Sequence, residues 1–355
     1  MRRSRIRSQE PGGSAPWVGY LGWHGRGNIG DDAIYDAVRS QLPGAAFVDL
    51  PCFPHERIWS PARGLHRSLA AGTQVVGGGT IVGRRSWRRA IKRGSALTNN
   101  TAGYAIGVGV EDPVFQGRRS GSAGDELRRW PAILSEFHTV SVRGPRSAEL
   151  LSDVGLTVEV AGDPALLLPQ PDVAPEEGLI GVNLGFGDDL WGHDPNGLAD
   201  EISRAVKHLS SQGYRFVGIL MNPKDRRWTE VALDGLAADI VLPGDARAAA
   251  AELARCSVAV VSRLHAGILA SLSATPTIAL EYQPKCRDFA LSIDNAGLLI
   301  RTDQLTSTAV IDRVGDALAG GAALRSATGA AVDRLRNRLQ TEYGALAGQL
   351  GLARP

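Results

Sequence analysis

The sequence predicts an α/β fold of two Rossmann-like domains that face each other across a cleft. Short β-branched runs alternate with helix-like segments along the chain, which is typical of parallel sheets. The length of 355 residues exceeds one ordinary domain. Near the middle, QPDVAPEE at 170–177 is rich in proline and acidic residues and shows no periodicity, which indicates a hinge.

We expect the chain to divide into five segments. Residues 1–16 are rich in Arg, Ser, Gly and Pro without the apolar stretch of a signal peptide, so a disordered lead is expected. The other segments are a first Rossmann-like domain at 17–169, a linker at 170–178, a second Rossmann-like domain at 179–322, and a C-terminal helical segment at 323–355. An apolar stripe at helical spacing predicts that this last segment packs back on the body of the protein.

Composition and charge argue against several classes of protein. The 39 basic and 37 acidic residues leave a net charge of +2, which does not indicate a nucleic-acid-binding protein. No run approaches the roughly 20 apolar residues of a membrane span. The three cysteines are scattered without zinc or disulfide spacing, and no metal cluster is evident. We therefore expect a cytoplasmic protein without a metal or other cofactor.

The first domain opens with a strand, a glycine-rich loop and a helix. The strand is expected at 17–21, the loop at 22–30, and the helix from Asp31 onward, where acidic side chains favour a helix start. The spacing differs from G-x-G-x-x-G and does not imply a dinucleotide. Glycines let backbone N–H groups approach a ligand, although a tight turn that binds nothing is the alternative. The candidate binding residues of this loop are Gly27, Asn28, Gly30 and Asp31.

Two further strands of this domain end in groups that can bind an anion. A strand at 73–76 stops at three glycines, of which Gly78 and Gly79 are candidate backbone contacts. A strand at 139–142 is followed by Arg143, whose planar guanidinium suits a carboxylate or phosphate. The alternative for Arg143 is an ion pair with Asp163 that holds a loop. The other expected elements are strands at 45–50, 101–110 and 157–160 and helices at 65–71, 125–134 and 147–154.

A strongly basic run with one tryptophan extends from Arg84 to Arg93. A solvated face is the usual role of such a run. The functional alternative is peripheral contact with anionic lipid at the inner surface of the cytoplasmic membrane, or with a lipid-linked diphosphate acceptor.

The second domain repeats the alternation of strands and helices. Its strands are expected at 179–184, 216–220, 240–242, 259–261, 277–280 and 298–300, and its helices at 200–211, 228–236, 246–256 and 266–273. Two successive strands end in polar clusters, with Arg263 and His265 after one and Tyr282 and Lys285 after the next. Because ligands bind at the carboxyl ends of parallel strands, these side chains predict a site for a small anion with a histidine for proton transfer. Solvated charges beside a hydrogen-bonded histidine are the alternative.

Four stretches, in order, resemble the polysaccharide pyruvyl transferase family. They are GYLGWHGRGNIGDDAI at 19–34, the glycines at 77–79, SVRGPRSAELLSDVGLTVEVAGDPALLL at 141–168, and SRLHAGILASLSATPTIALEYQPKCRDFA at 262–290. The resemblance implies a GT-B-like glycosyltransferase architecture, with the acceptor on the first domain and the donor on the second. The first loop is longer than the family pattern, and Glu281 stands where a small polar residue is commoner. Both departures concern the acceptor.

The resemblance also implies an activity, the transfer of pyruvate from phosphoenolpyruvate onto two hydroxyls of a sugar as a cyclic ketal. The family's donor-binding and catalytic positions fall on Arg143, His265 and Lys285, and further substrate contacts on Arg263 and Tyr282. His265 is expected to protonate the enol, while the cations hold the carboxylate and phosphate. The expected acceptor is a polysaccharide, a glycolipid or a lipid-linked glycan.

Two other functions stay open at this point. A glycosyltransferase that uses a nucleotide sugar would share the fold, so the fold does not separate it from a pyruvyl transferase. A scaffold or regulator could keep the fold without activity, but the complete set of Arg143, His265 and Lys285 argues against it.

Overall fold

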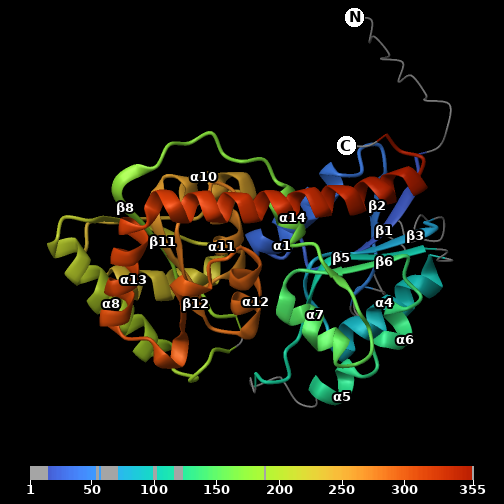
Figure 1. The fold of residues 1–355 in the computed structure, drawn as a ribbon, viewed down its shortest axis with the longest axis horizontal. Coiled ribbons are helices and arrows are strands. Elements are labelled where there is room, and N and C mark those ends of the chain that lie inside the picture. The colour runs from blue at the N-terminus through green and yellow to red at the C-terminus, as the bar shows by residue number, and fades with distance from the viewer. Residues whose placement is uncertain are drawn as a thin grey trace, which may run out of the picture.

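The computed structural model describes residues 15–52, 56, 71–98, 102–115, 123–187 and 189–353. It contains two parallel sheets, each flanked by helices, that lie next to each other along the long axis of the molecule (Figure 1). The predicted lead at 1–16 and the predicted helix at 65–71 lie almost entirely outside the described residues.

The first sheet has the strand order β2-β1-β3-β5-β6-β7, with β4 paired to β5. Its strand pairs are all parallel, so the strands end at one common edge. The strands are β1 (Trp17–Leu21), β2 (Ala46–Asp49), β3 (Thr73–Val76), β4 (Gly79–Val82), β5 (Ala102–Val110), β6 (Thr139–Val142) and β7 (Glu159–Val160). The helices are α1 (Ile29–Ser40), α4 (Arg85–Leu97), α5 (Ala123–Leu127), α6 (Pro131–Leu134), α7 (Pro145–Ser152) and the short η1 (Pro164–Leu167).

The second sheet has the order β10-β9-β8-β11-β12-β13, which is the doubly wound Rossmann order with its switch point between β8 and β11. Its strands are β8 (Glu176–Asn183), β9 (Arg215–Ile219), β10 (Asp239–Val241), β11 (Cys256–Val261), β12 (Thr277–Glu281) and β13 (Leu299–Arg301). Its longer helices are α8 (Pro195–Ser211), α9 (Arg226–Leu233), α10 (Ala246–Ala254), α11 (Leu264–Ser271), α12 (Pro284–Ser292) and α13 (Ser307–Ala319). Three short helices are η2 (Pro223–Asp225), η3 (Ala296–Leu298) and η4 (Thr302–Gln304).

One apolar cluster continues from the first half of the chain into the second. It includes Val18 and Ile34 in the first half, Leu264 and Ile268 of α11, and Leu335 of the C-terminal helix, all buried. Full burial of a side chain of this size contributes about 1.5–3 kcal/mol to folding. The two halves are therefore held together by shared apolar packing as well as by the linker.

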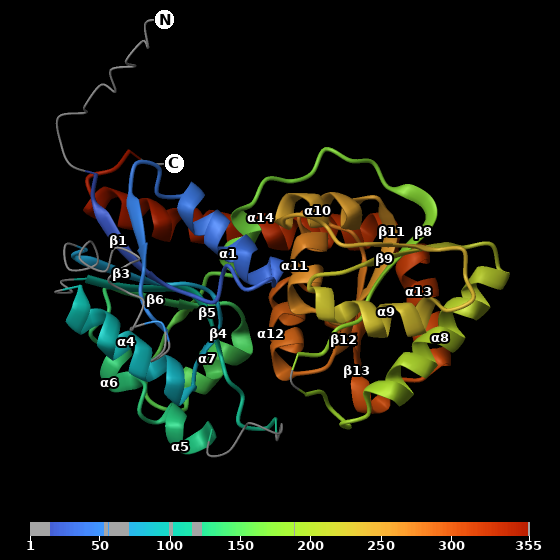
Figure 2. The same ribbon diagram turned by 180° about the vertical axis from the view of Figure 1, so that it is seen from behind.

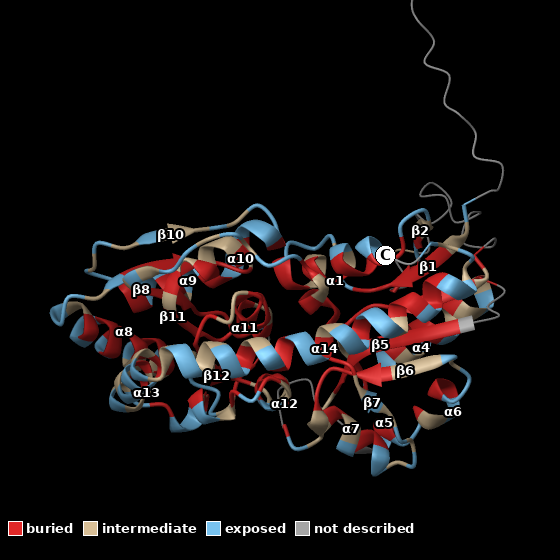
Figure 3. Ribbon diagram, turned by 45° about the horizontal axis from the view of Figure 1, so that its top comes forward, coloured by how far each residue is buried: buried red, intermediate tan, exposed pale blue. Residues whose placement is uncertain are grey.

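The C-terminal helix α14 (Gly321–Gln349) runs along both halves (Figure 1). One of its faces is buried against them and the other is exposed (Figure 3). Arg325 donates a hydrogen bond to the carbonyl of Ser257 in the second half at 3.2 Å. Arg336 donates to the carbonyl of Leu166 in the first half at 2.6 Å. The helix thus connects the two domains on one side of the molecule.

The predicted linker at 170–178 is too long, because β8 already begins at Glu176. The amide of Glu176 donates to the carbonyl of Arg255 at 2.8 Å, and the hydroxyl of Ser257 donates to the carbonyl of Glu176 at 2.6 Å. These bonds extend the sheet into a segment whose proline and acidic residues predicted a hinge.

Three helices also differ from the prediction. The expected helix at 125–134 is two helices, α5 and α6, and Pro131 starts the second because it has no N–H for a continuing helix. The cluster at 281–285, expected as a loop, leads into α12, with Pro284 at its first position. Helix α13 had no counterpart in the prediction. In the described part of the chain, no helix has both the length and the apolar character needed to cross a bilayer.

Candidate functional site

The start of α1 lies where the two halves meet, beside α11 (Figure 2). Asn28 is the N-cap of α1. The amide of Ile29 donates to the carbonyl of Met221 at 3.0 Å, and Nδ2 of Asn222 donates to the carbonyl of Gly27 at 2.9 Å. The predicted glycine loop of the first domain is therefore hydrogen-bonded directly to the second.

Arg143 follows β6 and is completely buried. Its Nη1 lies 3.7 Å from Oδ2 of Asp163, which is too long for a hydrogen bond. None of its three guanidinium nitrogens has a hydrogen-bond acceptor within reach in the described part of the chain. A Cβ added to Gly109 would lie 2.6 Å from Nη2, so this glycine makes room for the guanidinium. A buried cation without acceptors is costly, and an anion bound here would relieve that cost.

His265 is the second residue of α11, and its side chain is 11% exposed. Its Nε2 lies 3.7 Å from Oδ2 of Asp163, the same oxygen that faces Arg143. The ring rests against the first turn of α1, where a Cβ added to Gly30 would lie 2.3 Å from the ring atoms. Arg143 of the first domain and His265 of the second therefore meet at one buried carboxylate.

Asp31 and Lys285 extend this cluster from the first turns of α1 and α12. Nδ2 of Asn28 donates to the carboxylate of Asp31. Burial raises the pKa of Asp31, while His265, the bond from Asn28 and the charge of Lys285 oppose the rise. The ammonium of Lys285 also lies 4.7 Å from the ring centre of the buried Tyr282, a cation–π contact.

The charges around His265 oppose its protonation. Burial lowers the pKa of His265 from 6.5 to about 4. The carboxylate of Asp31 opposes this shift, whereas Arg143, Lys285 and Arg263 add to it. The imidazole is therefore neutral near pH 7 in this arrangement. An anion bound among the three cations would offset their charge and raise the pKa of His265.

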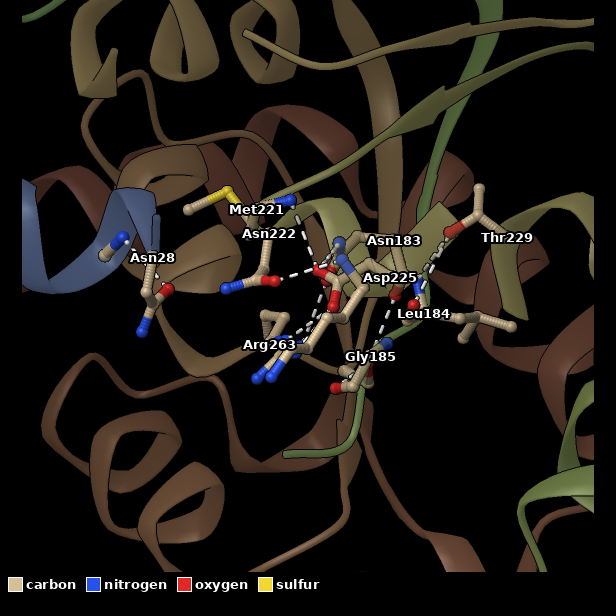
Figure 4. A network of polar contacts seen from close by, with 12 residues as sticks. Asn28, Asn183, Leu184, Gly185, Met221, Asn222, Asp225, Thr229 and Arg263 are labelled. Carbon is tan, nitrogen blue, oxygen red and sulfur yellow. Dashed lines mark hydrogen bonds and ion pairs between the residues drawn. The ribbon is translucent and has the colours of Figure 1, made fainter. Parts of the chain in front are cut away.

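Arg263 lies at the start of α11 and is held by an ion pair with Asp225 (Figure 4). Its Nη2 and Nε lie 2.6 Å and 3.0 Å from the same oxygen, Oδ1. The other oxygen of Asp225 accepts from the amide of Met221 at 3.3 Å and from Nδ2 of Asn183 at 3.4 Å. The third guanidinium nitrogen, Nη1, lies 3.8 Å from the position that a Cβ added to Gly187 would occupy. The ion pair thus fixes two nitrogens of Arg263 and leaves Nη1 beside the glycine-containing end of the β8 loop.

The two predicted glycines after β3 have different surroundings. Gly79 has a φ of +99°, and the nearest atom to a Cβ there would be Oδ1 of Asp31 at 3.8 Å. A Cβ on Gly78 would lie 3.0 Å from the side chain of Ile34 and 3.2 Å from Pro164. Gly79 therefore borders the charged cluster at Asp31, while Gly78 allows the chain to pack closely against Ile34 and Pro164.

The structure brings Arg143, His265, Asp31 and Lys285 together, and Arg263 adjoins them. Sequence reasoning treated Asp163 only as a loop partner of Arg143, although its place in the Gly-Asp-Pro turn after β7 marked it as a residue at a strand end. Asp225 was missed, and its signal was the polar Asn-Pro-Lys-Asp sequence that follows β9. In the described ranges, no group of three or more His, Cys, Asp or Glu residues is arranged to hold a metal ion.

A family model described as polysaccharide pyruvyl transferase matches residues 28–284 of the chain. The match includes every residue of the cluster except Lys285, which is the next residue after it. No curated protein matches the chain.

Several solved structures share the fold at low sequence identity. MnaA of S. aureus with UDP has a TM-score of 0.62 at 11% identity, with 96% of this chain and 99% of that chain covered. A putative UDP-N-acetylglucosamine 2-epimerase from Listeria monocytogenes has a TM-score of 0.59 at 13% identity, covering 92% and 96%. HepE of Anabaena, in complex with UDP and glucose, has a TM-score of 0.57 at 9% identity, covering 94% and 99%. At these identities the likeness concerns the fold alone, and that fold is the GT-B-like pair of Rossmann-like domains.

Proposed function

The chain belongs to the polysaccharide pyruvyl transferase family, and we propose that it moves pyruvate from phosphoenolpyruvate onto two hydroxyls of one sugar, giving a cyclic ketal and inorganic phosphate. The proposed acceptor is a sugar of a polysaccharide, a glycolipid or a lipid-linked glycan. The donor itself supplies the transferred group, so the proposed reaction needs no resident cofactor.

The observation that carries this proposal is the buried guanidinium of Arg143, which has no hydrogen-bond acceptor within reach in the described part of the chain. Its planar fork suits the carboxylate of phosphoenolpyruvate. The ammonium of Lys285, a compact point charge, suits the phosphate, and Nη1 of Arg263 is available to the same group. A small molecule with two anionic groups matches cations supplied by both domains.

His265 is the proposed proton donor to the methylene carbon of phosphoenolpyruvate. Its low pKa requires that it gain a proton when the donor binds, and the donor's negative charges favour this because they offset Arg143, Lys285 and Arg263. Transfer of that proton makes the methylene a methyl group and leaves C2 electron-poor.

A first sugar hydroxyl then forms a bond to C2, and the C2–O bond to phosphate breaks, with the electron pair leaving on phosphate. The second hydroxyl adds to C2 and closes the ketal. Of the two hydroxyl protons, one returns to His265 and the other leaves on the phosphate. Asp31, beside His265 and Gly79, is the proposed acceptor for a hydrogen bond from the incoming sugar hydroxyl.

Separate measurements of binding and turnover test this assignment. His265→Ala is expected to keep the thermal stabilisation by phosphoenolpyruvate but to release no phosphate in the presence of acceptor. His208→Ala, an exposed histidine at the end of α8, is the matched control and should behave as the parent. Equal turnover by His265→Ala and the parent would refute the role of His265.

The second candidate is a glycosyltransferase that uses a nucleotide sugar, and the observation in its favour is the fold shared with UDP-bound structures. A ligand stabilises the folded protein only if it binds it, by about 2.7 kcal/mol at 100 times its Kd. We expect thermal stabilisation by phosphoenolpyruvate and none by UDP- or GDP-sugars. The reverse pattern would favour the glycosyltransferase.

A further inference from the structure

Helix α4 separates its basic residues into two groups. Trp87, Ala90, Ile91 and Gly94 form its buried side. Arg85, Arg89 and Lys92 are exposed and follow one another at spacings of four and three residues, so they form one stripe on the helix. We refer to these three residues as the basic face of α4. The helix lies on the side of the sheet away from α1 and α14 (Figure 2).

The other three arginines of this segment have partners within the protein. Arg84 is paired with Glu111, Arg88 with Glu126, and Arg93 donates to the carbonyl of Cys52 at 3.0 Å. In the described part of the chain, no acidic side chain pairs with Arg85, Arg89 or Lys92, and the first turn of α4 contains no acidic residue. Arg85 also faces the positive end of the helix dipole, so it weakens the helix. Folding stability does not account for the basic face.

Trp23 adds an exposed aromatic ring beside this helix. Its side chain is one of the few large apolar groups on the surface, at 38% exposure. Its ring meets that of Trp87 edge-on, with 6.3 Å between centres, and the guanidinium of Arg26 lies 4.3 Å from its centre. Tryptophan next to cations is the combination favoured at the headgroup level of a bilayer.

We propose that the basic face of α4 and Trp23 dock the protein on a phospholipid surface with anionic headgroups. Three unpaired cations complement the charge of such a surface, and the exposed ring gives an apolar contact that a soluble polyanion would not use. The first turn of α4 follows the carboxyl end of β4, and Trp23 lies four residues before Gly27. Docking through these residues holds the protein at the lipid surface.

Docking on lipid also indicates the class of acceptor, and that part of the inference rests on the proposed function. A protein held at that surface meets saccharides that are anchored in the same lipid. The acceptor class inferred from docking is accordingly a lipid-linked saccharide rather than a finished soluble polymer. Vesicle binding itself needs neither donor nor turnover, so it is measured independently of pyruvyl transfer.

Sedimentation with phosphatidylcholine vesicles, with and without 30% phosphatidylglycerol, tests the docking. The parent is expected to bind the anionic vesicles only, and less so as salt rises. Each cation near such a surface is worth about 5-fold in binding, so Arg85→Glu/Arg89→Glu/Lys92→Glu should lose about 100-fold or more. The control, Arg204→Glu/Lys207→Glu/Arg313→Glu, makes the same charge change on α8 and α13 and should bind as the parent. Unchanged binding of the α4 variant, or equal loss in the control, would overturn the proposal.

A second measurement locates Trp23. Brominated anionic vesicles should quench part of the tryptophan fluorescence of the parent and of Trp228→Phe, and Trp23→Phe should lose most of this quenching. Quenching of Trp23→Phe to the same extent as the parent would contradict a lipid-facing role for Trp23. Binding of heparin without binding of vesicles would contradict it as well. A cooperative urea unfolding transition with the midpoint of the parent confirms that the α4 variant folds, and it is measured separately from docking.

Discussion

Replacement of Arg143 by methionine separates a binding role from a structural one. The guanidinium is fully buried. Among the described residues it has no hydrogen-bond acceptor within reach, and its only ion-pair partner there is Asp163, at 3.7 Å. If Arg143 serves to bind an anion, its removal should abolish that binding without a large loss of stability. If it is a structural ion pair, its removal should destabilise the fold.

The expected loss of stability is small because two contributions oppose each other. Each buried donor without a partner costs about 1–3 kcal/mol, and Arg143→Met removes that cost at Nε, Nη1 and Nη2. Loss of one partner from a buried ion pair typically costs about 3–5 kcal/mol, here because Asp163 is left alone. The net effect on the free energy of unfolding should therefore lie between a loss of about 2 kcal/mol and a gain of about 6 kcal/mol. The double variant Arg143→Met/Asp163→Asn removes both charges and should be at least as stable as the single one.

Urea denaturation with and without phosphoenolpyruvate measures both effects. At 100 times the Kd, the ligand should add about 2.7 kcal/mol to the parent and nothing measurable to Arg143→Met. A loss of more than about 4 kcal/mol of stability in Arg143→Met, together with the same stabilisation by phosphoenolpyruvate as in the parent, would show that Arg143 is a structural ion-pair residue.

Four further predictions concern the other residues of the site. The NMR titration of His265 should have its midpoint near pH 4 and move upward with phosphoenolpyruvate; an unshifted midpoint would contradict charge compensation. Because the unfolded chain binds this proton from about pH 6.5 and the folded one only near pH 4, stability should fall as pH falls through that window. The loss is at most about 3 kcal/mol, and His265→Gln should reduce it. Gly30→Ala should abolish turnover because its Cβ would lie 2.3 Å from the ring of His265. In the control Gly267→Ala, the nearest contact of the Cβ would be 3.8 Å, so folding should be unimpaired. Equal turnover by Gly30→Ala and Gly267→Ala would contradict this packing. Asp225→Asn should weaken phosphoenolpyruvate binding about 10-fold or more by releasing Arg263, and unchanged binding would show that Arg263 does not contact the donor.

The parts of the fold that the sequence predicts well are those with a strong local pattern. The β-branched runs ending at Arg143 and before Arg263 marked strands, and parallel strands end at one edge, so both arginines were expected near the cleft. The glycines before α1 and the small residues of α11 were likewise visible. These features depend on neighbours in the chain.

Features that depend on contacts between residues far apart in the sequence could not be predicted from local patterns. The oxygen of Asp163 between Arg143 and His265 results from the packing of two domains, and no local pattern encodes it. The ion pair of Arg263 with Asp225 joins residues 38 positions apart. Pro284 was interpreted as a loop residue, whereas proline is equally suited to the first position of a helix, and this placed Lys285 on α12.

The most direct test of the account is transfer of label from phosphoenolpyruvate carrying ¹⁴C in its three-carbon unit to a glycolipid extract, carried out in D₂O. The account predicts acid-labile label on sugar, with one deuterium in the new methyl group, for the parent and none of this product for His265→Ala. Equal transfer by both proteins, or transfer of sugar from a UDP- or GDP-sugar without any transfer from phosphoenolpyruvate, would contradict it.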